Sequence, residues 1–171
     1  QGLKSSSALS CAALRALNSY AWTGLSNSEI ADLSAKSQLM SNCAITGSMD
    51  DNWASLEPGW KLVDPSLGAS DSIIIQGEVD DSLSVLVCLR GERFREISLT
   101  RFSEQSQIFE RSLASIMSGA ALDCLSSNGM AVSAATGDHE ALMISNLCIA
   151  SGAVASGISG SGPAIAVVCF E

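Results

Sequence analysis

The sequence contains little positive charge. Its 171 residues include 9 Lys and Arg against 18 Asp and Glu, which gives a net charge of −9, and there is only 1 His. Proteins that bind DNA or RNA neutralise phosphates with clustered basic side chains. The charge balance therefore argues against a nucleic acid as partner, and equally against an anionic membrane surface.

Long apolar runs and paired cysteines are also missing. No apolar stretch approaches the roughly 18 to 20 residues that cross a bilayer, and the chain does not open with the basic and apolar segments of a signal peptide. The six cysteines stand far apart without a C-x-x-C pair, which disfavours metal knuckles and redox motifs. We therefore expect free thiols in a reducing compartment, and a cytoplasmic protein without membrane contact.

The apolar residues that are present, 47% of the chain, suffice for a folded core. Three- and four-residue spacing predicts a helix over 5–20 capped by its serines, and a second helix from Ser28, the expected N-cap, to Met40. Strands are expected at 60–63, 72–76, 83–89 and 164–170, and helical stretches at 104–125, 130–135 and 138–151, with residues 126–129 as an interruption. This order predicts an α+β fold, and the change of pattern near Pro65 predicts a boundary there.

A glycine, a cation and three hydroxyls stand together where the first helix is expected to begin. The segment reads Gly2, Leu3, Lys4, Ser5, Ser6 and Ser7. Unpaired backbone N–H groups and the helix dipole attract anions at such an N-terminus, as a phosphate site requires. An ordinary serine-rich helix cap is the alternative, and the spacing is not that of a Walker A loop.

A second loop is expected at residues 157–163, and its small-residue motif, Ser159 to Pro163, leads into the last apolar strand. Its members Gly160, Ser161 and Gly162 allow the backbone to approach a ligand closely, although a plain tight turn would have the same composition. Two Gly/Ser loops, one opening a helix and one entering a strand, suggest a polyphosphate that is held from two sides.

Adjacent acids, Asp50 and Asp51, follow the second helix in a polar segment that reads T-G-S-M-D-D over residues 46–51. A carboxylate near a transferring phosphoryl group can orient the attacking hydroxyl and accept its proton, or bind the metal. The alternative is the solvated start of a helix, since residues 46–57 are expected to be a loop or a helix start.

Two other features are expected to be structural. His139 is predicted to lie exposed at a helix start. The arginines Arg90, Arg93, Arg95 and Arg101 alternate with Glu92 and Glu96, which favours a solvated strand edge or turn. A clamp for a substrate carboxylate is the alternative for these arginines.

In this order, the three motifs resemble those of the GHMP kinase superfamily, which includes galactokinase, homoserine kinase and mevalonate kinase. Within the superfamily the sequence looks most like the archaeal shikimate kinases. Lys4 stands where most members carry glycine in a G-L-G-S-S-A motif, and residues 46–51 fit the pattern T-G-x-x-D-D. The segment 128–163 also resembles the C-terminal segment of the family, so the similarity spans nearly the whole chain.

The resemblance implies ATP-dependent phosphorylation of the 3-hydroxyl of shikimate, with ATP and Mg²⁺ as cofactors. It implies an N-terminal domain like domain 2 of ribosomal protein S5, here residues 1–66, and a ferredoxin-like C-terminal domain, here 67–171. Carried over by motif, residues 2–7 would wrap the ATP phosphates with Ser6 as a Mg²⁺ ligand. Asp50 would be the catalytic aspartate with Asp51 beside it, and residues 160–162 would line the phosphate and substrate side.

The sequence departs from the family pattern in two respects. Leu39 stands where mevalonate kinase-like members place a metal-binding glutamate. The strands that precede the G-L motif in the family are absent, so we expect an N-terminally truncated and inactive fragment. The apolar run 164–170 ends abruptly at Glu171, which suggests that sequence is missing at the C-terminus too. A homoserine- or mevalonate-type kinase and a non-catalytic binding module remain alternatives.

Overall fold

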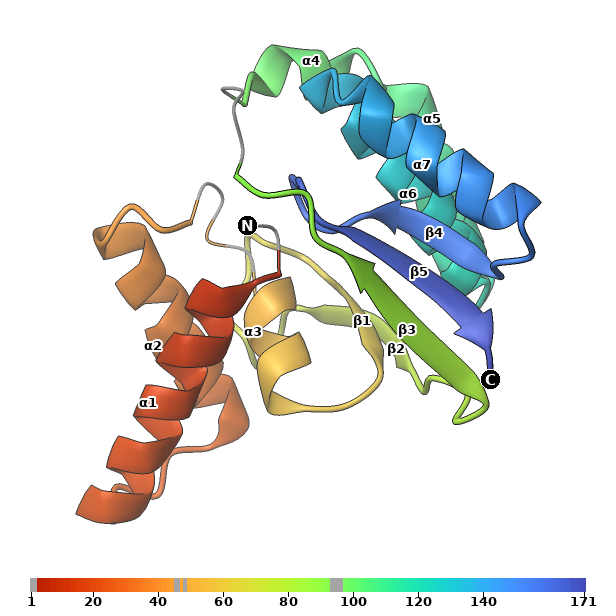
Figure 1. The fold of residues 1–171 in the computed structure, drawn as a ribbon. Coiled ribbons are helices and arrows are strands. Elements are labelled where there is room, and N and C mark those ends of the chain that lie inside the picture. Colours follow the sequence, from red (N-terminus) through yellow and green to blue (C-terminus); the bar gives the residue numbers. More distant parts are fainter. Residues whose placement is uncertain (1–2, 45–46, 48, 93–96) are drawn as a thin grey trace. The chain divides into compact units, whose positions relative to one another are not determined.

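The computed structural model describes residues 3–44, 47, 49–92 and 97–171. Its helices and strands confirm the expected α+β fold (Figure 1). The chain divides into two compact units at Val79 and Asp80, one formed by Lys4–Val79 and the other by the residues from Asp80 to Glu171 together with the first three. Each unit has a core of its own and is described separately.

The Lys4–Val79 unit combines three helices, which pack on one another, with a two-stranded sheet that contacts the third helix. Its elements are α1 (Ser5–Ala21), α2 (Asn27–Met40), α3 (Asp50–Leu56), β1 (Trp60–Val63) and β2 (Ile73–Gly77). The strands are antiparallel, with Trp60 opposite Gly77 and Leu62 opposite Ile75. The core joins Cys11 of α1, Ile30 and Ala31 of α2, and Trp53 and Leu56 of α3.

The predicted caps of the first two helices are wrong by a few residues. The serines at 5–7 are the first turn of α1, and the N-cap residue is Lys4, without a side-chain cap. Helix α2 is capped by Ser26 rather than Ser28: the Ser26 hydroxyl accepts from the Glu29 amide and the Glu29 carboxylate accepts from the Ser26 amide. This reciprocal capping box satisfies two backbone donors at once, which a lone serine at position 28 would not achieve.

The second unit covers one face of a three-stranded antiparallel sheet with helices (Figure 1). Its elements are β3 (Leu83–Cys88), α4 (Leu99–Ser103), α5 (Ser106–Met117), α6 (Ala121–Thr136), α7 (His139–Ala150), β4 (Ala155–Ile158) and β5 (Ile165–Phe170). Strand β5 is central, with Leu83 opposite Phe170 on one side and Ala155 opposite Val168 on the other. Val132, Ala141, Ile158 and Ile165 form the core between helices and sheet.

The expected interruption at 126–129 is wrong, because these residues lie inside α6. The break falls earlier, between the end of α5 and Ala121. A Cβ atom on Gly129 would stand 2.5 Å from the Gly157 Cα atom of β4. Gly129 is therefore a contact residue that lets helix and strand approach closely, and its low helix propensity does not end the helix.

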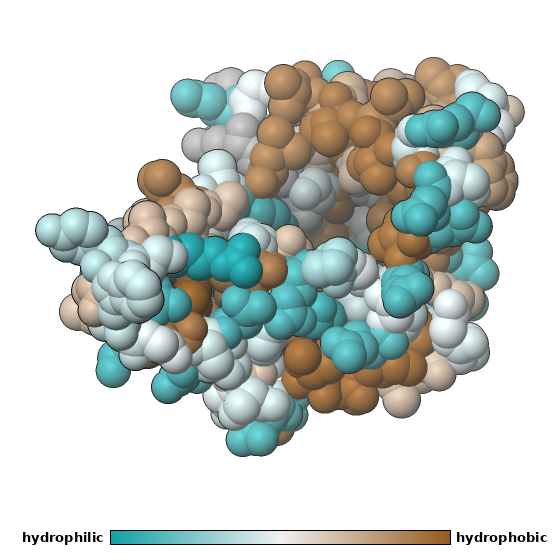
Figure 2. Space-filling model, turned by 90° about the horizontal axis from the view of Figure 1, so that it is seen from below, coloured by the Kyte–Doolittle hydropathy of each residue, from teal (hydrophilic) through white to brown (hydrophobic). Residues whose placement is uncertain are grey.

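Apolar side chains also reach the surface, where Figure 2 shows brown hydrophobic patches among the polar residues. Examples are Leu9 and Tyr20 of α1, and Val85 and Leu86 of the edge strand β3. Among the described residues, none of the helices combines the length and the apolar character that crossing a membrane requires.

Candidate active site

The start of α1 presents backbone donors that no side chain caps. Lys4 adopts the left-handed conformation, with φ 56° and ψ 25°, and the Lys4 carbonyl accepts the Ala8 amide at 3.2 Å. The amides of the first helical turn, residues 5–7, precede the first intrahelical bond. Their N–H groups and the positive end of the helix dipole suit an anion such as phosphate.

The Lys4 side chain joins this helix start to the aspartate pair. Its Nζ atom forms an ion pair with the Asp51 carboxylate and lies 3.8 Å from Asp50 Oδ2. The side chains of Lys4, Asp50 and Asp51 are 34%, 49% and 27% exposed. Two of the predicted motifs, 47 residues apart in the chain, therefore meet in one partly open cluster at the N-termini of α1 and α3.

The single positive charge of Lys4 does not neutralise the two carboxylates of this cluster. Burial, followed by the nearby Asp50 charge, raises the pKa of Asp51 above its ordinary value, although the Lys4 contact acts in the opposite direction. Desolvation and a like charge both disfavour the carboxylate form. The pair therefore attracts a proton or a further cation more strongly than an isolated exposed aspartate would.

A buried polar network lies beneath the cluster and was not predicted from the sequence. The Ser7 hydroxyl donates to Gln38 Oε1 at 3.0 Å, and Gln38 Nε2 donates to Asn52 Oδ1 at 2.9 Å. The Ser34 hydroxyl also donates to Asn52 Oδ1, at 2.6 Å. All four side chains are buried, so the Ser7 hydroxyl serves the network, while Ser5 and Ser6 are exposed.

This network connects α1, α2 and α3 directly behind the cluster. Asn52 follows Asp51 in α3, and Ser7 lies one turn after Lys4 in α1. Satisfied buried polar groups hold their helices in one arrangement. The only sequence signal was the four-residue spacing of Ser34 and Gln38, which places two polar residues on one face of α2.

The small-residue loop belongs to the other unit. The Ser159 amide donates to the Ala164 carbonyl at 2.8 Å and the Gly162 amide to the Ser159 carbonyl at 3.0 Å. Gly160 and Gly162 have φ of 54° and 79°, values that favour glycine. The expected start of this loop at 157 is wrong, since Gly157 and Ile158 belong to β4.

The remaining predicted residues are placed as follows. Leu3 is exposed, whereas Gly2, Thr46 and Ser48 lie outside the described residues. His139 is exposed at the first position of α7, as expected. Arg90 is not the solvated residue predicted, because its side chain is only 12% exposed; Arg93 and Arg95 are outside the described residues.

The residues present fit a magnesium ion that is shared with phosphates. The described part of the chain has no group of three His, Cys, Asp or Glu side chains able to enclose a metal. Leu39 packs against Gly47, where a Cβ atom would meet Leu39 Cδ1 at 2.6 Å. Position 39 therefore offers an apolar surface and no oxygen ligand for a metal. Mg²⁺ is commonly held by one or two carboxylates plus substrate phosphates, and the paired carboxylates of Asp50 and Asp51 supply such oxygens.

Comparison with known proteins gives one family match and one similar solved structure. Residues 1–59 match the family model of the GHMP kinases N terminal domain. The solved structure of a proposed homoserine kinase from Listeria monocytogenes matches 99% of this chain with a TM-score of 0.63 and 20% sequence identity, and the chain spans 58% of that protein's length. At this identity the likeness shows a shared fold. The family match is therefore confined to residues 1–59, and the structural likeness adds the fold of the rest of the chain.

Proposed function

We propose that this chain is part of an ATP-dependent kinase of the GHMP type, which phosphorylates a hydroxyl group of a small molecule. The observation that carries the proposal is the contact of Lys4 with the Asp50–Asp51 pair. This contact places two kinds of group side by side. The Lys4 ammonium and the uncapped N-terminus of α1 suit phosphates, and the carboxylates suit the acceptor hydroxyl.

The roles of the residues follow from these positions. The amides of residues 5–7 and the Lys4 ammonium bind phosphate oxygens. Asp50, the more exposed carboxylate, orients the acceptor hydroxyl. As the hydroxyl oxygen bonds to the γ-phosphorus and the bond to the ADP oxygen breaks, Asp50 takes the hydroxyl proton. Asp51 holds Lys4. For the loop at 160–162 the proposed role, binding of phosphate and substrate, rests on the resemblance of its motif to that of the family.

Magnesium bound with ATP would supply neutralisation of the phosphate charge. Ser6, exposed in the first turn of α1, and the aspartate pair would hold it together with the phosphates. The raised pKa of Asp51 is consistent with a site that gains from an additional cation.

For the substrate we propose shikimate, phosphorylated at its 3-hydroxyl, because Lys4 and the adjacent aspartates are the residues that distinguish the shikimate kinase pattern. Homoserine is the second candidate, because the structural likeness described above is to a proposed homoserine kinase. The two substrates share the reaction and differ only in the acceptor.

The test is a coupled ADP-release assay on the complete gene product with ATP and Mg²⁺, run in parallel with shikimate, homoserine and mevalonate. We expect the highest kcat/KM with shikimate. Faster ADP release with homoserine would show that homoserine is the preferred substrate, while the proposed kinase reaction would stand. Absence of release with all three, with ATP bound normally, would argue for a binding module.

A further inference from the structure

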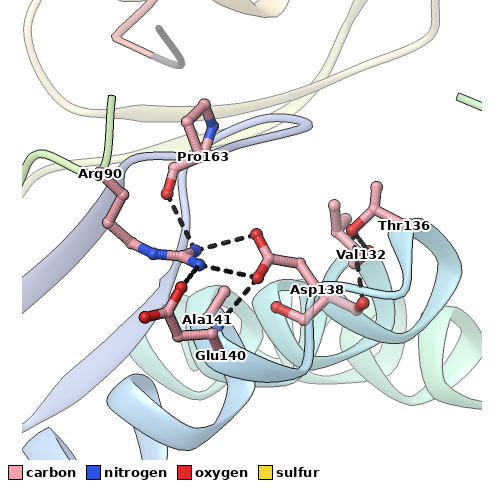
Figure 3. A network of polar contacts seen from close by, with 8 residues as sticks. Arg90, Val132, Thr136, Asp138, Glu140, Ala141 and Pro163 are labelled. Atoms are coloured by element: carbon pink, nitrogen blue, oxygen red, sulfur yellow. Dashed lines mark hydrogen bonds and ion pairs between the residues drawn. The ribbon is translucent and has the colours of Figure 1, made fainter. Parts of the chain in front are cut away.

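Arg90 is a largely buried arginine that connects three segments of the second unit. Figure 3 shows its guanidinium between Asp138, Glu140 and the Pro163 carbonyl. Its Nη1 and Nη2 atoms each donate to an Asp138 carboxylate oxygen at 2.9 Å, and Nη1 also donates to the Pro163 carbonyl at 3.3 Å. A further ion pair joins Nη2 to Glu140.

These partners come from distant parts of the sequence. Arg90 lies two residues after β3, Asp138 is the N-cap of α7 and accepts the Ala141 amide at 3.0 Å, and Pro163 closes the small-residue loop. Arg90 and Pro163 are 73 residues apart. The arginine therefore links the end of an edge strand, the start of a helix and the Gly160–Gly162 loop.

The loop is close to the acidic partner as well as to the arginine. A Cβ atom on Gly162 would stand 4.0 Å from Asp138 Oδ2 and 2.5 Å from Ile158 Cδ1. The backbone of the loop is thus confined between the core side chain Ile158 and the Arg90–Asp138 pair. A bidentate pair restricts both distance and orientation, which a single point charge would not do.

We propose that Arg90 is a positioning residue, which holds the Gly160–Gly162 loop against the N-terminus of α7 in the geometry that the loop needs to bind its ligand. The inference rests on the proposed function for the ligand, a nucleotide phosphate, but the position of the loop can be measured without any ligand. Arg90 acts through the Pro163 carbonyl and Asp138, and the proposal requires no contact of Arg90 with substrate.

The first test is amide hydrogen exchange by NMR in the ligand-free protein, with Arg90→Met. The Ser159 and Gly162 amides are protected by hydrogen bonds to nearby carbonyls. In Arg90→Met they should exchange about tenfold faster or more, because local opening no longer has to break the contacts of Arg90 with Asp138 and Pro163. The Val154 amide, bonded to the Val168 carbonyl at 2.8 Å, should be unchanged. Arg111→Met, the same substitution at an exposed arginine of α5, is the matched control and should alter neither.

The second test is titration with Mg²⁺ and a non-hydrolysable ATP analogue. Arg90→Met should weaken binding by about tenfold or more, since a displacement of about 1 Å in a positioned group can cost up to about 10²-fold. In turnover, KM for ATP should rise more than kcat falls. Arg90→Lys should recover only part of the affinity, because lysine cannot form the bidentate contact.

A second variant keeps the inference testable if Arg90→Met does not fold. Asp138→Asn retains a side-chain oxygen for the Ala141 amide but removes the negative charge that pairs with Arg90. It should therefore increase hydrogen exchange at the Ser159 and Gly162 amides. Combined with Arg90→Lys, its effect should be less than additive, since both changes weaken one interaction.

Unchanged exchange at Ser159 and Gly162 in a folded Arg90 variant would overturn the inference. Faster exchange with unchanged analogue affinity would also overturn it, because the loop geometry would then not govern binding. If the unsubstituted protein does not bind the analogue at all, the proposed function fails. In that case faster loop exchange in the variants still supports the positioning role of Arg90.

Discussion

Replacing Lys4 separates the backbone strain of this residue from its charge. A non-glycine residue in the left-handed conformation, which Lys4 adopts with φ 56°, costs roughly 1–2 kcal/mol. Glycine avoids that cost but loses about 0.5–1 kcal/mol through greater freedom in the unfolded chain. On the backbone alone, Lys4→Gly should therefore stabilise the protein by about 0.5–1 kcal/mol.

The charge contributes in the opposite direction. The Lys4 and Asp51 side chains are 34% and 27% exposed, so solvent screening limits their ion pair to about 1 kcal/mol or less. Lys4→Met loses the ion pair and keeps the strain, whereas Lys4→Gly loses both. We expect Lys4→Met to be about 1 kcal/mol less stable than wild type, and Lys4→Gly to lie within about 0.5 kcal/mol of it.

Urea unfolding of the three proteins at neutral pH and low salt measures these differences, and titration with an ATP analogue gives their affinities. Both variants should bind the analogue more weakly and with less dependence on salt, because each lacks the cation. If Lys4→Met were as stable as Lys4→Gly, the strain argument would be wrong. Unchanged affinity in both variants would remove Lys4 from the phosphate site.

Three other predictions follow from the aspartate pair and from the contact between α6 and β4. Asp50→Asn should lower kcat by at least about tenfold, below the usual general-base range of about 10² to 10⁴, with Tm nearly unchanged and Asp51→Asn milder. Because the pKa of Asp51 is raised in the folded state, its contribution to stability is present at low pH and is lost as pH rises through that pKa. Asp51→Asn should therefore gain stability relative to wild type as pH increases above about 4. Gly129→Ala should destabilise by about 1–2 kcal/mol, since a Cβ atom 2.5 Å from the Gly157 Cα forces helix and strand apart by more than the improved helix propensity of about 1 kcal/mol offsets. Asn128→Ala, at the exposed neighbouring position, is the control and should be neutral or slightly stabilising.

Each of these has a clear contrary result. Normal kcat in Asp50→Asn with loss of activity in Asp51→Asn would assign the catalytic role to Asp51. Normal kcat in both variants would mean that the two aspartates only begin helix α3 and have no catalytic role. A stability difference between wild type and Asp51→Asn that is independent of pH would contradict the raised pKa. Equal stability of the Gly129→Ala and Asn128→Ala variants would mean that the helix can shift without cost.

Local patterns in the sequence were enough to predict most elements. The spacing of apolar residues predicted α1, α2 and α7 within a few residues, and β-rich runs predicted β1, β2, β3 and β5. Helix and strand periodicity depends on neighbours in the chain, so it can be read without knowing what each element packs against. The Gly/Ser loops and the adjacent aspartates were recognisable for the same reason, because each motif is a short contiguous segment.

Long-range contacts decided what local patterns could not. Residues 126–129 look like a turn, yet they remain helical because Gly129 packs on Gly157, a contact that no local propensity contains. The cap at Ser26 instead of Ser28 is different, because Ser26 and Glu29 lie three residues apart and form a capping box that the local S-x-x-E spacing already contained.

The sequence by itself determined the α+β class and the residue types suited to phosphate chemistry, because those depend on composition and local spacing. Only the tertiary structure brought Lys4 to Asp51 across 47 positions and Arg90 to Asp138 across 48. An interleaved run of arginines and glutamates predicts a solvated surface, and nothing adjacent in the sequence indicates that Arg90 becomes largely buried on folding. Partners so distant meet only when whole helices and strands pack, and this packing occurs within each unit separately.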